Sequence, residues 1–161
     1  MIGDGTVALR VLLAAGLGMA IGIERELRDQ WAGMRTHILV SIGACLFTLM
    51  SAIGFSSFLG AGSKAAANAD VTRIASQVVV GIGFIGGGTI LRQGANVRGL
   101  TTAATLWVTA AIGLAVAAGA YFAATLSTVV AVVTLAGLKP LSKWIGHFGK
   151  RGARRIEDEE G

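Results

Sequence analysis

Residues 99–138 read GLTTAATLWVTAAIGLAVAAGAYFAATLSTVVAVVTLAGL, and they contain no Asp, Glu, Lys or Arg. A membrane-spanning helix needs roughly 20 mainly apolar residues. The stretch is therefore long enough for two such helices, over residues 100–118 and 121–138. Gly119 and Ala120, which separate them, allow either a tight helical hairpin or one long kinked helix.

Three further apolar segments extend the same pattern toward the N-terminus. They cover residues 7–23, 36–59 and 74–91. Arg10 interrupts the first segment in its opening turn, from where a long side chain can reach the lipid headgroups. Together with the two segments above, they predict an all-α fold, a polytopic membrane helix bundle of about five transmembrane helices.

The composition agrees with a membrane protein and excludes several other classes. Of 161 residues, 53% are hydrophobic, 14% are charged and 24 are Gly, with a mean hydropathy of +0.69. A soluble domain carries about 25% charged residues, so a soluble enzyme is excluded. The single cysteine, Cys45, excludes an intrachain disulfide framework. The net charge of +5 does not indicate nucleic-acid binding, because the basic residues lie in short groups between apolar segments.

The distribution of Lys and Arg predicts the orientation in the membrane. Cytoplasmic loops carry an excess of these residues, and most of the 14 fall after the first, third and fifth apolar segments. We therefore expect the N-terminus outside and the C-terminus in the cytoplasm. Residues 1–138 form the transmembrane domain in this prediction. Residues 139–161 form a basic amphipathic cytoplasmic tail with an acidic end.

A glycine-rich run, GIGFIGGG at residues 81–88, matches the G-x-G-x-x-G pattern of dinucleotide-binding proteins. That fold needs an acidic residue about 20 positions later, and residues 72–155 contain none, so no cofactor is predicted. Small residues instead allow membrane helices to approach closely. The alternative is a loosened helix whose backbone lines a polar cavity. The predicted packing pairs are Gly18 with Gly22 and Gly83 with Gly87.

Polar side chains at the ends of the apolar segments are the candidate functional residues. A charged or amide group at membrane depth has to be paired or hydrated, so we expect these residues to form a small number of clusters. No catalytic motif and no metal-binding motif accompanies them. The candidates are Glu24, Arg35, Arg73, Gln77, Asn96, Arg98, Thr101 and Thr102.

Glu24 has two alternative interpretations. It lies four residues before Arg28, and this spacing is typical of a solvated, self-neutralising loop. If the five-helix order holds, Glu24 shares the cytoplasmic side with Arg35 and Arg98, and one of these is its expected ion-pair partner. Gln77 lies one turn after Arg73, inside an apolar segment, and is expected to have a polar partner.

Four motifs in this order resemble the MgtC/SapB family. They are GIERE at residues 22–26, AGMRTH at 32–37, RIASQVVVGIGFIGGG at 73–88 and NVRGLTTAATLW at 96–107. The resemblance implies a bacterial inner-membrane protein linked to magnesium limitation, acid stress and virulence through survival inside macrophages. It also implies the absence of enzymatic activity. The soluble C-terminal domain of longer members is absent from this sequence.

Two functions remain open on the sequence. The first is a non-enzymatic modulator that binds lipid or another membrane protein, and the resemblance names the ATP synthase as such a partner; a homo-oligomer is also open. The second is an ion transporter or channel for Mg²⁺ or protons, with Gln77, Asn96 and Arg98 lining the path. The modulator is favoured, because carboxylates within the spans are lacking.

Overall fold

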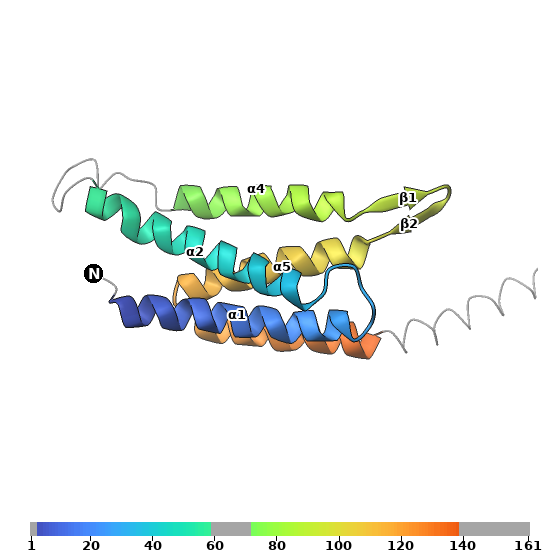
Figure 1. The fold of residues 1–161 in the computed structure, drawn as a ribbon, viewed down its shortest axis with the longest axis horizontal. Coiled ribbons are helices and arrows are strands. Elements are labelled where there is room, and N and C mark those ends of the chain that lie inside the picture. Colours follow the sequence, from blue (N-terminus) through green and yellow to red (C-terminus); the bar gives the residue numbers. More distant parts are fainter. Residues whose placement is uncertain (1–2, 59–71, 139–161) are drawn as a thin grey trace, which may run out of the picture.

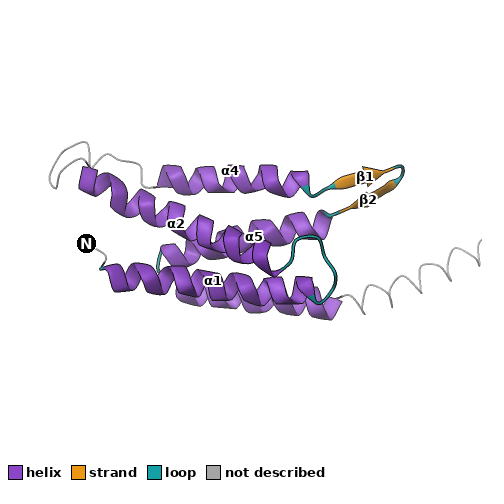
Figure 2. Cartoon of the chain, in the orientation of Figure 1, coloured by secondary structure: helices purple, strands orange, loops and turns teal. Residues whose placement is uncertain are grey.

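The computed structural model describes the backbone of residues 3–58 and 72–138, and the side chains of these residues except those of 53–58 and 72–75. The described residues form a bundle of five helices and one short β-hairpin, so the predicted helical membrane bundle is confirmed (Figures 1 and 2). The elements are α1 (Asp4–Glu26), α2 (Met34–Phe58), α4 (Thr72–Gly88), β1 (Leu91–Gln93), β2 (Asn96–Arg98), α5 (Leu100–Ala117) and the helix Tyr121–Leu138.

The helices run in alternating directions along a common axis (Figure 1). The helix Tyr121–Leu138, drawn in orange, lies beside α1, while α4 lies on the opposite side of the bundle against α5 and α2. As a result, the α1–α2 loop, the β-hairpin and the end of Tyr121–Leu138 share one end of the bundle, here called the hairpin end. The N-terminal end of α1 and the turn after α5 share the other.

A tight hairpin joins α5 to the helix Tyr121–Leu138, which decides between the two alternatives for residues 118–120. Gly119 has a φ of 82°, a left-handed conformation that glycine adopts without strain. The Ala120 N–H donates to the Ala115 carbonyl at 2.9 Å. From α1, the Arg10 guanidinium donates to the Ala117 carbonyl at 2.7 Å and to the Tyr121 hydroxyl at 3.0 Å. Arg10 therefore satisfies a helix-end carbonyl.

Small and branched side chains fill the core between α1, α2, α5 and the helix Tyr121–Leu138. Ala14, Cys45 and Ala124 are fully buried there. The outward faces remain strongly apolar, since Phe84 is 86% and Phe122 is 81% exposed. A soluble protein would cover such residues, whereas lipid surrounds them favourably. Four of the described helices are long and apolar enough to cross a membrane.

Helix α4 ends earlier than its sequence predicts. The apolar segment extends to residue 91, but α4 ends at Gly88 and Leu91 begins the strand β1. The three consecutive glycines at 86–88 favour helix termination because glycine has a low helix propensity. The Thr89 hydroxyl then donates to the Gly86 carbonyl at 2.7 Å. At 17 residues, α4 is about 25 Å long, which is shorter than the roughly 30 Å hydrocarbon core.

The β-hairpin is the one element that the sequence did not predict. The strands β1 and β2 pair in antiparallel register, with Gln93 opposite Asn96 and Leu91 opposite Arg98. Gly94 takes a φ of 62° in the turn between them, as two-residue hairpin turns require. The predicted tail at residues 139–161 lies outside the described residues.

The alternating helix directions predict the sidedness of single-cysteine labels. In a Cys45→Ala background, Ala95→Cys in the hairpin should react with a membrane-impermeant thiol reagent from the cytoplasmic side. Lys64→Cys, which precedes α4, should react from the outer side. The reason is the excess of Arg and Lys at the hairpin end. Labelling of both positions from one side of sealed vesicles would contradict the five-helix arrangement.

Candidate functional site

A buried ion-pair network lies where α1 reaches the hairpin end. The Arg25 Nε donates to Glu24 Oε2 at 2.6 Å, and Arg28 Nε forms an ion pair with Glu24 Oε1. The side chains of Glu24 and Arg25 are only 10% and 5% exposed. The expected pairing of Glu24 with Arg35 or Arg98 is therefore wrong. Arg25 and Arg28 are closer in sequence and satisfy the same carboxylate.

The other interpretation of Glu24, pairing with Arg28 four residues later, is confirmed, but the Glu24 carboxylate is buried and not solvated as expected. Arg28 additionally donates to the Ala136 carbonyl at 3.1 Å, which ties the α1–α2 loop to the helix Tyr121–Leu138. The neighbouring Glu26 carboxylate accepts the Met34 N–H at 2.9 Å and so caps the start of α2. These contacts fix the loop that forms one wall of the cavity described below.

Gly18 and Gly22 of α1 lie directly against the backbone of α2. A Cβ atom at Gly18 would lie 2.7 Å from the His37 carbonyl oxygen, and one at Gly22 would lie 2.5 Å from the Cα of Met34. Gly113 of α5 approaches the Ser41 carbonyl in the same way. These glycines allow the close helix contact that membrane bundles use.

Gly83 and Gly87 do not pack as the G-x-x-x-G pattern predicts. Within the described chain, a Cβ atom at either position would have no neighbouring atom within 4 Å. Both glycines lie on an exposed face of α4. Gly86, between them, instead faces α5, where a Cβ atom at Gly86 would lie 3.5 Å from the Ala103 carbonyl oxygen. The helix contacts α5 through the face that carries Ile82 and Gly86, because these positions are four residues apart.

A cavity of about 300 Å³ opens at the hairpin end, between the α1–α2 loop and the start of α5. Both polar and apolar atoms line it. The sequence identified Arg98 and Thr102 as candidates, and the structure brings them together here. Sequence reasoning missed the opposite wall because a loop residue carries no periodicity. The lining residues are Asp29, Gln30, Trp31, Arg98, Gly99 and Thr102.

The other predicted residues lie apart from this cavity. Arg35 is exposed in the first turn of α2, and Asn96 is exposed in β2. Thr101 lines a separate, mainly apolar cavity of about 570 Å³ between α1, α5 and the helix Tyr121–Leu138. Arg73 belongs to α4, but its side chain lies outside the described residues. Among the candidates whose side chains are described, Arg98 and Thr102 line the same cavity, and the others lie at separate places.

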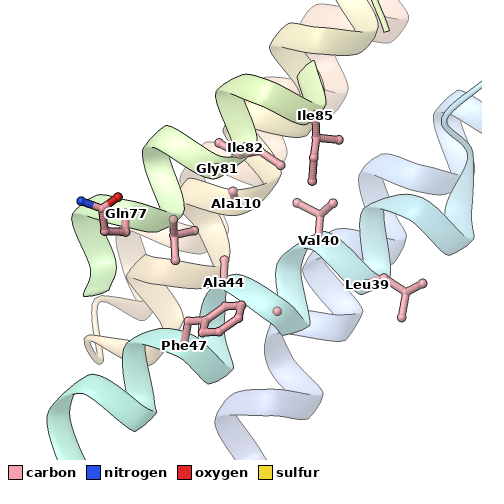
Figure 3. A pocket seen from close by; sticks show the side chains of 11 residues that line it. Leu39, Val40, Ala44, Phe47, Gln77, Gly81, Ile82, Ile85 and Ala110 are labelled. Carbon is pink, nitrogen blue, oxygen red and sulfur yellow. The ribbon is translucent and has the colours of Figure 1, made fainter. Parts of the chain in front are cut away.

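Gln77 lies at one end of an apolar groove between α2, α4 and α5 (Figure 3). The groove has a volume of about 540 Å³. Val40 and Ala44 of α2 face Ile82 of α4 across it. Gln77 is exposed, and it is the one amide among the groove's lining residues.

Two buried polar groups in α2 were not predicted. His37 and Ser41 are both 0% exposed and one helical turn apart. The His37 Nδ1 makes a hydrogen bond with the Gly33 carbonyl at 2.9 Å. Within the described chain, neither His37 Nε2 nor Ser41 Oγ has a hydrogen-bond partner. By contrast, the hydroxyls of Thr105 and Thr109 in α5 donate to carbonyls of their own helix.

Gly99 holds the hairpin against α4, and this gives a second prediction. Its φ is 88°, and a Cβ atom there would collide with the Thr89 carbonyl oxygen. We expect Gly99→Asn to destabilise the hairpin by about 1 to 3 kcal/mol, measured as faster amide hydrogen exchange over residues 91–98. Gly94→Asn is the matched control, because Gly94 also has positive φ but has open space around it and Asn tolerates that conformation. Equal exchange in both variants would contradict the steric argument.

Comparison with known proteins identifies the chain. The sequence model of the MgtC family matches residues 11–144, which include every described helix apart from the start of α1. The chain belongs to the MgtC family. Among curated members, "Putative magnesium transporter YhiD" of Escherichia coli (strain K12) is 49% identical over 113 residues, covering 70% of this chain and 51% of YhiD.

Two relatives carry the name of the MgtC family itself. "Protein MgtC" of Brucella abortus (strain 2308) is 45% identical over 125 residues, which cover 78% of this chain and 48% of that protein. "Protein MgtC" of Salmonella typhimurium (strain 14028s / SGSC 2262) is 43% identical over 122 residues, covering 76% and 48%. The chain thus spans about half the length of the curated relatives it matches. No solved structure matches it.

Proposed function

We propose that this MgtC-family protein is a non-enzymatic modulator of the bacterial inner membrane that acts by binding another membrane protein. The observation that carries the proposal is the charge of the bundle. Arg10 near one end donates to a carbonyl and a hydroxyl, and at the other end the single carboxylate of Glu24 is shared by Arg25 and Arg28. Fixed guanidinium groups oppose the entry of a divalent cation.

The described residues also lack the ligands that a magnesium path needs. Magnesium prefers carboxylate and carbonyl oxygens in octahedral geometry. No group of three or more His, Cys, Asp or Glu side chains able to hold a metal occurs in 3–58 and 72–138. Glu24 is already shared by two arginines. We therefore connect the protein to magnesium through regulation of a partner rather than through import.

The partner would bind through the membrane-embedded helix faces. The exposed face of α4 and the adjoining groove offer apolar surface and small residues to a second helix. The ATP synthase, suggested by the family resemblance, is one candidate, and a second copy of this chain is another. Bacterial relatives and helical rather than barrel-type spans support the inner membrane as the location.

Ion transport is the second candidate function, and one observation favours it. His37 Nε2 and Ser41 Oγ are buried without a hydrogen-bond partner among the described residues. Unpaired polar groups inside a membrane bundle are typical of proton or ion pathways. The relative YhiD of Escherichia coli (strain K12) also carries the name "Putative magnesium transporter YhiD".

Flux measurements on purified protein in liposomes distinguish the two functions. We expect Mg²⁺ and proton fluxes equal to those of protein-free liposomes, with an added ionophore as the positive control. In cells that need the protein for growth at low magnesium, Asn96→Ala and Arg98→Ala should abolish that growth, while both variants still insert into the membrane. A protein-dependent flux that His37→Asn removes would overturn the modulator and establish the transporter.

A further inference from the structure

The cavity at the hairpin end carries three features that suit an anion. Arg98 lines it, and no carboxylate or carbonyl among the described residues pairs with its guanidinium. Thr102 also lines it, and this residue, which is only 5% exposed, brings a hydroxyl to the same wall. Gly99 precedes α5, whose N-terminus has no side-chain cap. Together these groups offer a cation without an ion-pair partner, a hydroxyl and the uncapped start of a helix.

This combination matches the chemistry of a phosphate group. Helix N-termini bind phosphate because their N–H groups are unpaired and the helix dipole is positive there. Arginine binds phosphate oxygens with charge-assisted hydrogen bonds. A threonine hydroxyl can donate a hydrogen bond to a phosphate oxygen. One wall of the cavity therefore has the chemistry of an anion site.

The opposite wall has the chemistry of a cation site. Asp29 lines it, held in a left-handed turn with a φ of 52°. It forms no ion pair with Arg98, although both line the same cavity. The Gln30 Nε2 donates to the Arg28 carbonyl at 3.0 Å, which leaves the Gln30 amide oxygen as an acceptor. Trp31 adds an aromatic ring, which attracts an ammonium group.

The position and size of the cavity restrict the ligand further. It lies at one end of the bundle, where a Trp that is 67% exposed is typical of the headgroup region. Its volume of about 300 Å³ is at the lower limit of small-molecule sites. A whole lipid does not fit in it, but a polar headgroup does.

We propose that this cavity binds the phosphoethanolamine headgroup of a membrane phospholipid. Arg98, the Thr102 hydroxyl and the start of α5 bind the phosphate, while Asp29, the Gln30 amide oxygen and the Trp31 ring bind the ammonium. The site recognises a zwitterion, so it selects against phosphatidylglycerol, which has no cation for Asp29. This inference is independent of whether the protein modulates a partner or transports an ion.

Lipid binding to the purified full-length chain tests the proposal. Native mass spectrometry compares delipidated protein with phosphatidylethanolamine and with phosphatidylglycerol of the same acyl chains. We expect phosphatidylethanolamine to bind about tenfold more tightly, and soluble O-phosphoethanolamine to compete with it. Equal binding of the two lipids would overturn the ammonium half of the site. Preferential binding that O-phosphoethanolamine does not displace would place the lipid elsewhere, for example in the acyl-sized groove beside Gln77.

Three variants separate headgroup binding from folding. Arg98→Gln should weaken phosphatidylethanolamine binding about 10-fold to 100-fold, as expected for a lost charged hydrogen bond. Arg92→Gln is the matched control, because Arg92 lies on the same hairpin, donates to the Gly94 carbonyl and does not line the cavity. Asp29→Asn should retain lipid binding but lose the preference over phosphatidylglycerol. A loss of fold cannot produce such a change of preference. An unchanged preference in Asp29→Asn, or equal effects of the two arginine variants, would refute the proposal.

Discussion

Gly22→Leu in α1 should destabilise the bundle by about 3 kcal/mol or more and reduce the yield of folded protein in detergent to a small fraction. A Cβ atom at this position would lie 2.5 Å from the Cα of Met34 and 3.1 Å from its carbonyl oxygen. Backbone atoms cannot rotate away as a side chain can, so α1 and α2 would have to separate. Thermal unfolding monitored by size-exclusion chromatography measures the effect.

Gly83→Leu in α4 is the matched control for Gly22→Leu. Both glycines belong to a G-x-x-x-G pair in an apolar helix, but no atom of the described chain lies within 4 Å of a Cβ at Gly83. We expect its melting temperature to stay within a few degrees of the parent protein. A loss as large as that of Gly22→Leu would contradict the open environment of α4 and would point to a partner helix on that face.

Glu24→Ala should destabilise the protein by about 3 to 5 kcal/mol, since removal of one member of a buried ion pair leaves the other charge uncompensated. Here the substitution leaves two guanidinium groups without their carboxylate, because Arg25 and Arg28 both pair with Glu24. The Glu24 side chain is only 10% exposed, so water cannot replace it. The measurement is the free energy of unfolding in mixed micelles.

Replacing both buried partners separates charge from packing. The double variant Glu24→Leu with Arg25→Met removes the buried pair together and should recover at least half of the loss, as hydrophobic replacements of buried pairs do. Arg35→Ala is the exposed control and should change stability by less than about 0.5 kcal/mol. If the double variant were as unstable as Glu24→Ala, the ion pair would not be the cause.

The sequence predicts the helices well and the contacts between them poorly. Apolar length alone places the helices, since a span must satisfy its own backbone hydrogen bonds. Apolar length does not distinguish a hairpin at Gly119 from a kinked helix, and the prediction of two helices there came from the distribution of Lys and Arg. The hairpin at 91–98 was missed because its strands are three residues long and exposed. Such strands carry no alternating pattern.

The candidate site was likewise only partly predictable from the sequence. Arg98 and Thr102 could be selected from sequence, because polar residues at a membrane boundary require an explanation. Asp29 and Trp31 could not, since only the fold of the α1–α2 loop places them opposite Arg98. The glycine pairs show that a G-x-x-x-G motif does not by itself establish a helix–helix contact. Gly22 meets α2, whereas Gly83 has the same spacing and faces outward. The difference lies in which face of each helix is packed.

The hydrogen bonds of Arg10 also determine when the bundle can be completed during synthesis. Arg10 is separated from its partner Tyr121 by 111 positions in the chain. At about 5 to 20 residues per second, the ribosome reaches Tyr121 roughly 6 to 22 s after Arg10. Until then, the guanidinium has neither the Tyr121 hydroxyl nor the Ala117 carbonyl. During this time the Arg10 side chain of α1 extends toward the headgroups. The bundle is completed around Arg10 only when the turn between α5 and the helix Tyr121–Leu138 is inserted.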